Sequence, residues 1–231
     1  MANGGRNVAA ATDLGSADPL ERDDRLPTYF GAAWDAVRGF AELLRMYGAE
    51  RGLLGPNESG RLWERHLLNS AGVAALLPHS GTLVDLGSGA GLPGIVVAAM
   101  RPSANVVLLE PMERRTDWLQ LVVNALDLPN VEVLRGRAEE VPGALMADAL
   151  TARAVTSLDR LFRWAAPLVR PSGGLYAIKG ARAGDEVAAA AGSARRYGWS
   201  RVRLEEVTTL EGVEVTRVVC AVREGGPTGV R

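Results

Sequence analysis

Val84-Asp-Leu-Gly-Ser-Gly-Ala-Gly-Leu-Pro-Gly94 is the segment that indicates the fold most strongly. It begins in an apolar run typical of a buried strand and continues into a glycine-rich turn. Pro93 suits the first turn of a following helix, because it has no N–H to leave unpaired there. Glycine carries no Cβ, so the turn allows the backbone to approach a ligand closely. Since ligands of open α/β sheets lie beyond the carboxyl ends of strands, the segment predicts a ligand site.

Short apolar runs alternate with helical patterns on the carboxyl side of this segment. The predicted strands are 82–86, 106–110, 131–134, 147–152 and 175–178, and the predicted helices are 93–100, 114–127, 158–169 and 185–197. This alternation is typical of a parallel sheet with helices on both faces. Two more runs, 201–208 and 213–222, are joined by Thr209-Leu-Glu-Gly212 and predict a hairpin. A hairpin at the edge of a parallel sheet favours an α/β fold, namely the seven-stranded, Rossmann-like fold of class I S-adenosylmethionine-dependent methyltransferases.

The residues before the sheet predict a helical extension. Apolar residues recur at helical spacing over 28–47, and a second helix is predicted from about Gly60 to Leu77, where Pro78 ends it. We therefore divide the chain into an N-terminal helical extension and a methyltransferase domain, flanked by a disordered tail and a frayed terminus. The helical extension is 25–78, the methyltransferase domain is 79–223, the disordered tail is 1–24 and the frayed terminus is 224–231.

Composition excludes several classes of protein. The chain has 231 residues and a formal net charge of -1, which argues against extensive wrapping of nucleic acid but allows a local basic patch. It has no apolar run of about 18 residues, and its start does not resemble a secretion signal, so we expect a cytoplasmic protein. Cys220 is the single cysteine, which excludes an intrachain disulfide. One cysteine and two histidines (His66 and His79) are too few to favour a zinc site. We expect a monomer without metal or membrane association.

The glycine loop also fits a nicotinamide dinucleotide, which is the main alternative ligand. In that motif, Gly-x-Gly-x-x-Gly, the first glycine directly follows the strand. Here that glycine is Gly87, and the sixth position counted from it is Leu92, where the motif requires glycine. The motif is matched only when it begins at Gly89, two residues after the strand end. Asp85 at the strand end favours the cationic S-adenosylmethionine and would repel a pyrophosphate. The alternative role for Asp85 is to cap the loop.

Two further positions suit an adenosine ligand of either class. Glu110 closes the second strand, where a carboxylate can accept both ribose hydroxyls. Ala138 and Glu139 follow the third strand, in the loop that meets the adenine in this fold. Glu139 and Glu140 equally suit the solvated start of a short helix, and Glu110 could be an exposed residue without function.

Arg153 and Lys179 end two strands on the expected active edge, and Lys179 is the single lysine of the chain. The fourth strand lacks the Asn/Asp-Pro-Pro-aromatic motif of many amino-group methyltransferases. Cys220 lies in the predicted C-terminal hairpin, where it is not placed to attack a pyrimidine ring. An acceptor with a ready lone pair, such as guanine N7, needs alignment more than a base. We therefore assign Arg153 and Lys179 to positioning and charge stabilisation, and expect no general base.

Candidate RNA contacts lie on the second helix and among the arginines. His66 and Asn69 share a face of an otherwise apolar helix, where a buried core histidine is the alternative to a pocket-lining one. Phosphate contacts are expected from arginines that cluster in the sequence, and Lys179 completes the set. These arginines are Arg114, Arg115, Arg195, Arg196, Arg201 and Arg203.

Five ordered motifs over residues 28–222 resemble the glucose-inhibited division protein B family, also called RsmG, whose members methylate guanine N7 in small-subunit ribosomal RNA. The motifs are Trp63-Glu-Arg-His-Leu-Leu-Asn-Ser70, the loop 85–94, Arg114-Arg115 with Arg137-Ala-Glu-Glu140, Thr151-Ala-Arg-Ala154 and Tyr176-Ala-Ile-Lys-Gly180. The resemblance implies the cofactor S-adenosylmethionine and the substrate 16S ribosomal RNA, at guanine 527 beside the decoding centre.

The resemblance also implies individual roles. Cofactor contacts would come from Gly87, Leu92, Ala138, Glu139 and Arg153. Asn69 stands where family members usually carry aspartate, which removes a possible negative charge from that helix.

Three other functions are compatible with parts of this pattern. They are a methyltransferase of the same fold for a small molecule, a nicotinamide-dependent oxidoreductase, and a ribosome-assembly factor without catalysis. Thermal shifts with S-adenosylhomocysteine and NADH, followed by methyl transfer to small ribosomal subunits, separate these functions from the expected one.

Overall fold

The computed structural model describes residues 18–55, 58–141, 143 and 145–224. Most of the predicted tail, 1–17, and of the predicted frayed terminus, 225–231, lies outside these residues. Residues 18–24, the rest of the predicted tail, are described, and Pro19–Arg22 form a 3-10 helix there. The carboxylate of Asp18 caps that helix at Leu20 N and accepts a second hydrogen bond from Trp63 N at 2.7 Å. Glu224, the first residue of the predicted frayed terminus, is also described, and its backbone N donates to Gly198 O at 2.8 Å.

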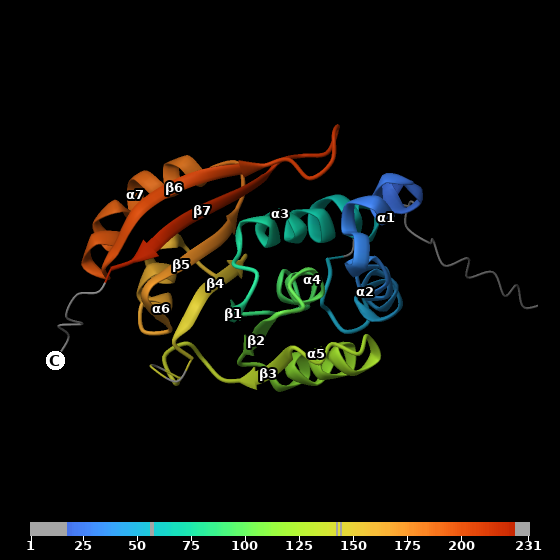
Figure 1. The fold of residues 1–231 in the computed structure, drawn as a ribbon, viewed down its shortest axis with the longest axis horizontal. Coiled ribbons are helices and arrows are strands. Elements are labelled where there is room, and N and C mark those ends of the chain that lie inside the picture. The colour runs from blue at the N-terminus through green and yellow to red at the C-terminus, as the bar shows by residue number, and fades with distance from the viewer. Residues whose placement is uncertain (1–17, 56–57, 142, 144, 225–231) are drawn as a thin grey trace, which may run out of the picture.

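The predicted seven-stranded sheet is confirmed, with strand order β3-β2-β1-β4-β5-β7-β6. β1 to β5 pair in parallel, β7 pairs with β5 in antiparallel, and β6 forms the edge beside β7 (Figure 1). The strands are β1 (Gly81–Leu86), β2 (Ala104–Glu110), β3 (Val131–Arg135), β4 (Ala147–Arg153), β5 (Val169–Lys179), β6 (Trp199–Val207) and β7 (Thr216–Arg223). β5 begins six residues before its prediction, because an irregular register across Ala147 and Ala149 extends the pairing.

Four helices follow the strands as predicted. They are α4 (Gly94–Met100), α5 (Glu113–Ala125), α6 (Leu158–Ala165) and α7 (Ala183–Arg196). Before the sheet lie α1 (Arg25–Phe30), α2 (Trp34–Tyr47) and α3 (Asn69–Leu76). The single helix predicted for 28–47 is interrupted at Gly31, whose φ of 51° ends α1. The second predicted helix starts with wider i→i+5 turns over Trp63–Leu68, a π-helix, before α3.

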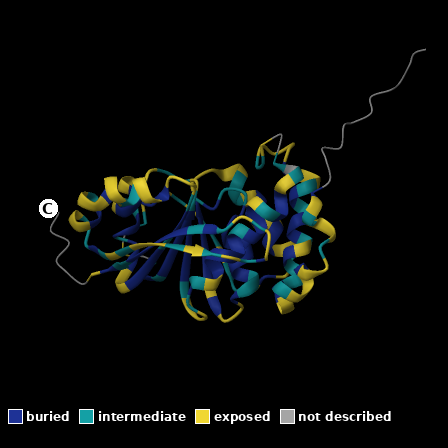
Figure 2. Ribbon diagram, turned by 90° about the horizontal axis from the view of Figure 1, so that it is seen from above, coloured by how far each residue is buried: buried dark blue, intermediate teal, exposed yellow. Residues whose placement is uncertain are grey.

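The two faces of the sheet are covered by separate apolar clusters. Successive residues of β1 point to opposite faces, as a pleated strand requires, so Leu83 packs in one cluster and Val84 in the other. The extension and α4 with α5 cover the first face, and α6 with α7 cover the second (Figure 1). Figure 2 shows the buried strands between helices whose outer faces are exposed. The extension shares its core with the sheet, and the domain boundary at 78 stays a prediction.

Among the described residues, every helix is too short or too polar to span a lipid bilayer. Among the same residues, no group of three His, Cys, Asp or Glu side chains is arranged to hold a metal ion.

Candidate active site

Two cavities open at the carboxyl edge of the parallel strands. β1, β2, β4 and β5 run in the same direction, so their last residues meet at one edge. One cavity of about 420 Å³ lies over β1 and β2, and another of about 1030 Å³ lies over β4 and β5. Arg153, Ala154 and Val155 line both, so the two cavities share a wall. Ala154 has a φ of 54°, an uncommon conformation for a residue with a side chain.

The smaller cavity brings together most of the predicted cofactor residues. Its walls include the predicted Gly87, Gly89, Leu92, Glu110, Ala138, Glu139 and Arg153, with Arg115 and Leu53 in addition. Its volume falls within the range of about 300–1,000 Å³ usual for small-molecule sites. Leu53 belongs to the N-terminal extension, which therefore helps to enclose this cavity.

Hydrogen bonds fix the glycine loop in place. Gly87 N and Ser88 N both donate to Leu109 O, at 2.8 and 3.2 Å. Gly89 N donates to Glu110 Oε2 at 2.9 Å, and Glu110 Oε1 accepts from Met112 N at 3.0 Å. The Glu110 carboxylate is thus held by two backbone N–H groups, and each of its oxygens retains a second lone pair for a ribose hydroxyl.

Asp85 does not line the cavity, contrary to the prediction. It is 1% exposed and lies beneath the loop, where Oδ2 accepts a hydrogen bond from Gly94 N at 3.0 Å. This contact fits the alternative role, in which Asp85 caps the loop. Its Oδ1 has no hydrogen-bond partner among the described residues. Burial raises the pKa of the Asp85 carboxyl to about 7.

Gly91 also lies below the cavity wall. A Cβ there would come within 2.8 Å of Ile95 Cγ1 and 3.2 Å of Phe40 Cζ, so glycine is required by packing.

The smaller cavity as a whole fits S-adenosylmethionine. Its loop presents backbone without side chains, Glu110 suits a ribose, and the orphaned Asp85 oxygen supplies negative charge below a cationic ligand.

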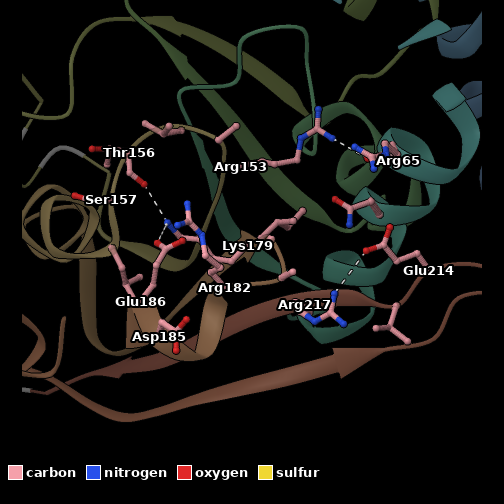
Figure 3. Close-up of a pocket in the computed structure, with 18 of the residues that line it drawn as sticks. Arg65, Arg153, Thr156, Ser157, Lys179, Arg182, Asp185, Glu186, Glu214 and Arg217 are labelled. Atoms are coloured by element: carbon pink, nitrogen blue, oxygen red, sulfur yellow. Dashed lines mark hydrogen bonds and ion pairs between the residues drawn. The ribbon is translucent and has the colours of Figure 1, made fainter. Parts of the chain in front are cut away.

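The larger cavity is a cleft lined by charges of both signs (Figure 3). Its cations are Arg65, Arg153, Lys179, Arg182 and Arg217, and its anions are Glu64, Asp159, Asp185, Glu186 and Glu214. Lys179 Nζ donates to Thr156 O at 3.0 Å and to Glu186 Oε2 at 2.8 Å. Lys179 therefore lies in the cleft with its charge already paired.

The structure brings only part of the predicted RNA set to this cleft. Asn69 and Lys179 line it, and Asn69 Nδ2 lies 3.3 Å from Thr216 Oγ1. His66 does not line it: the residue is 6% exposed, because its ring packs inward beside Arg153. Arg115 lines the smaller cavity instead, and Arg114 is exposed on α5 and lines neither.

The remaining predicted arginines lie at the opposite edge of the sheet or on its outer strand. Arg195 and Arg196 end α7, whose first turn is the end near the cleft, and a helix of 14 residues spans about 20 Å. Arg201 and Arg203 are on the edge strand β6, and Arg203 is paired with Glu205 at 2.6 Å. None of these four lines either cavity.

Arg182 and Arg217 are cleft residues that the sequence analysis missed. Arg217 pairs opposite Lys179 across β5 and β7, and this long-range pairing is not visible in a single sequence. Arg182 follows Lys179 by three residues, just past the strand end, and its position there was a usable signal. Arg65 lies beside His66 in the second predicted helix and was not assigned a role.

Comparisons with known proteins agree with this geometry. The family model for rRNA small subunit methyltransferase G matches residues 34–214. A protein of Beutenbergia cavernae named ribosomal RNA small subunit methyltransferase G is 50% identical over 184 residues, covering 80% of this chain and 86% of that protein. One of the same name from Thermobifida fusca is 47% identical over 194 residues, covering 84% and 81%.

A solved structure shares the fold. It is a SAM-dependent methyltransferase from Aquifex aeolicus, with a TM-score of 0.54 and 20% sequence identity, covering 76% of this chain and 97% of that one. The predicted class I methyltransferase fold is thereby confirmed.

Proposed function

This chain belongs to the rRNA small subunit methyltransferase G family, and we propose that it transfers a methyl group from S-adenosylmethionine to N7 of a guanine in 16S ribosomal RNA. We place the target at guanine 527, as the sequence resemblance implies. The enzyme acts in the cytoplasm on the RNA of the small subunit. The observation that carries the proposal is the wall shared by the two cavities, at Arg153.

The smaller cavity is the cofactor site. S-adenosylmethionine bound there would supply a methyl group on a positively charged sulfur. Glu110 is held by two N–H groups and would orient the ribose, and Ala138 and Glu139 line the part of the cavity where the adenine would lie. The Asp85 charge lies below the loop and favours a cation above it.

The larger cavity receives the guanine and its neighbouring phosphates. Arg65, Arg182 and Arg217 supply positive charge for phosphates at its walls. Lys179 and Arg153 line the cleft, where their N–H groups can donate hydrogen bonds to guanine O6 and so orient the base for attack by N7. Guanine N7 is unprotonated at neutral pH, so the residues align the acceptor and need not remove a proton.

The test is transfer of tritium from labelled S-adenosylmethionine to small subunits that lack the modification. We expect incorporation into 16S RNA, and chemical cleavage at 7-methylguanine should map it to one nucleotide. Turnover without RNA would instead indicate a small-molecule substrate. A thermal shift with NADH and none with S-adenosylhomocysteine would contradict the cofactor assignment.

A further inference from the structure

The guanidinium of Arg153 is held by acceptors on the N-terminal extension. Its Nη1 lies 2.9 Å from His66 Nδ1 and donates to Arg65 O at 3.2 Å. Both acceptors belong to the π-helical segment Trp63–Leu68, and segments of this kind occur often at functional sites. Figure 3 shows Arg153 directed toward Arg65 at the wall of the cleft.

Chemistry fixes the protonation state of His66. A guanidinium has only donors, so Nδ1 must accept, and the imidazole is neutral with its proton on Nε2. Burial, followed by the charge of Arg153, lowers the pKa of His66 to about 4. The other charged groups that face the ring are Arg65, which lowers the pKa further, and Glu58, which raises it.

The ring has no other partner that would explain its burial. Nε2 makes no hydrogen bond among the described residues, and the nearest carboxylate oxygen, Glu58 Oε1, is 3.7 Å away. A histidine buried for its own stability would be expected to pair both nitrogens. His66 instead uses one nitrogen, on the residue that lines both cavities.

We infer that His66 is a positioning residue for Arg153, holding the guanidinium at the boundary between the two cavities as a neutral acceptor. This inference rests on the proposed function in one respect, the placing of Arg153 at the cofactor. Arginine has a long side chain with many rotamers, so a fixed acceptor reduces the cost of ordering it for each ligand.

A double-mutant cycle tests the inference in the full chain. The variants are Arg153→Ala, His66→Phe and the pair, and the primary measurement is the dissociation constant of S-adenosylhomocysteine by calorimetry. We expect Arg153→Ala to weaken binding at least ~10-fold, the loss of a charged hydrogen bond, and His66→Phe to weaken it roughly 3- to 10-fold. In the Arg153→Ala background, His66→Phe should add nothing, because its effect passes through Arg153.

Further variants separate positioning from a merely structural role. His66→Gln retains a neutral acceptor and should restore affinity to within about 3-fold of the wild type, whereas His66→Leu should behave as His66→Phe does. His79→Gln is the matched control, since His79 is exposed and lines neither cavity. Thermal unfolding of each variant identifies any that does not fold, and His66→Leu replaces His66→Phe in the cycle if that variant unfolds.

The outcomes are distinguishable from failure of the proposed function. Equal, additive losses from His66→Phe in both backgrounds would overturn the inference, as would wild-type affinity in Arg153→Ala. Failure of wild-type protein to methylate small subunits would contradict the proposed function alone, because the cycle uses binding and needs no RNA.

Discussion

The carboxylate of Asp85 accepts a hydrogen bond from Gly94 N at 3.0 Å beneath the glycine loop, with its second oxygen unpaired. The contact joins the end of β1 to the start of α4, which fixes both ends of the loop. It also places a titratable group directly below the proposed cofactor site. Its charge state, therefore, should be linked to ligand binding.

Binding of S-adenosylmethionine should strengthen as pH rises through about 7. Burial raises the pKa of Asp85 to about 7 in the free protein, and a cationic ligand favours the ionised form. Affinity measured by calorimetry from pH 6 to 8 should thus increase and then level off. Asp85→Asn should flatten the profile and bind more weakly at pH 8. An unchanged slope in that variant would show that another group titrates.

The free energy of unfolding should depend on His66 in the acid range. The pKa of His66 falls from 6.5 to about 4 on folding, so the unfolded chain binds the extra proton. The stability it contributes is complete above about 6.5 and is lost as pH falls toward 4. The raised pKa of Asp85 has the opposite sign, costing stability as pH rises from 3.8 to about 7.

Comparing variants isolates the histidine. Urea unfolding of His66→Gln should show a smaller decrease in stability between pH 6.5 and 4 than the wild type, at about 1.4 kcal/mol for each pKa unit removed. Identical acid profiles would mean that folding leaves the pKa of the His66 ring unchanged.

Lys179 should affect methylation and leave cofactor affinity unchanged. It lines the larger cavity only, with Nζ bonded to Thr156 O and Glu186. We expect Lys179→Ala to lower kcat/KM for ribosomal RNA roughly 10-fold or more, as loss of a charged contact would. Lys179→Arg should also be impaired, because a planar fork does not replace a compact ammonium. Wild-type turnover in Lys179→Arg would show that charge alone suffices.

The loop glycines should separate stability from binding. Gly89 and Gly91 both have positive φ, 56° and 99°, so alanine strains either. A Cβ at Gly89 meets nothing closer than Gly87 O at 3.7 Å, whereas at Gly91 it comes within 2.8 Å of Ile95. Gly91→Ala should lose about 1–3 kcal/mol more stability, the usual cost of overpacking.

The complementary readout is cofactor affinity. Gly89→Ala should lose less stability than Gly91→Ala yet weaken S-adenosylhomocysteine binding, because Gly89 lines the cavity and Gly91 does not. Equal melting temperatures for the two variants would contradict the packing argument.

The sequence pattern predicted the sheet and its hairpin because each depends on local periodicity. The loop residues, Glu110 and Arg153 were placed correctly at the active edge, since parallel strands carry their last residues to one side. Asp85 was placed at the right strand end but on the wrong side of the loop. Whether a strand-end side chain points up or down depends on the loop's backbone conformation, which the residue types alone do not specify.

The arginines predicted to contact RNA are not gathered at the cleft, for a related reason. Adjacency along the chain suggested Arg195 and Arg196, but the length of α7 carries them away from the cleft. Arg217 is distant in sequence from Lys179 and is brought beside it by antiparallel pairing. Long-range register decides that contact, and one sequence without relatives aligned to it does not reveal register.

The salt dependence of RNA binding should identify which arginines contact phosphates. Each phosphate neutralised contributes roughly 0.7–0.9 to the slope of log K against log salt concentration. Arg182 lines the cleft immediately before α7, and Arg195 is exposed near the far end of that helix, which makes them a matched pair. Arg182→Gln should weaken binding to small-subunit RNA and reduce the slope by about one phosphate. Arg195→Gln, which makes the same change of charge, should leave the slope unaltered. Equal effects of the two variants would mean that RNA senses only the net charge of the protein, and the cleft would then have no special part in binding.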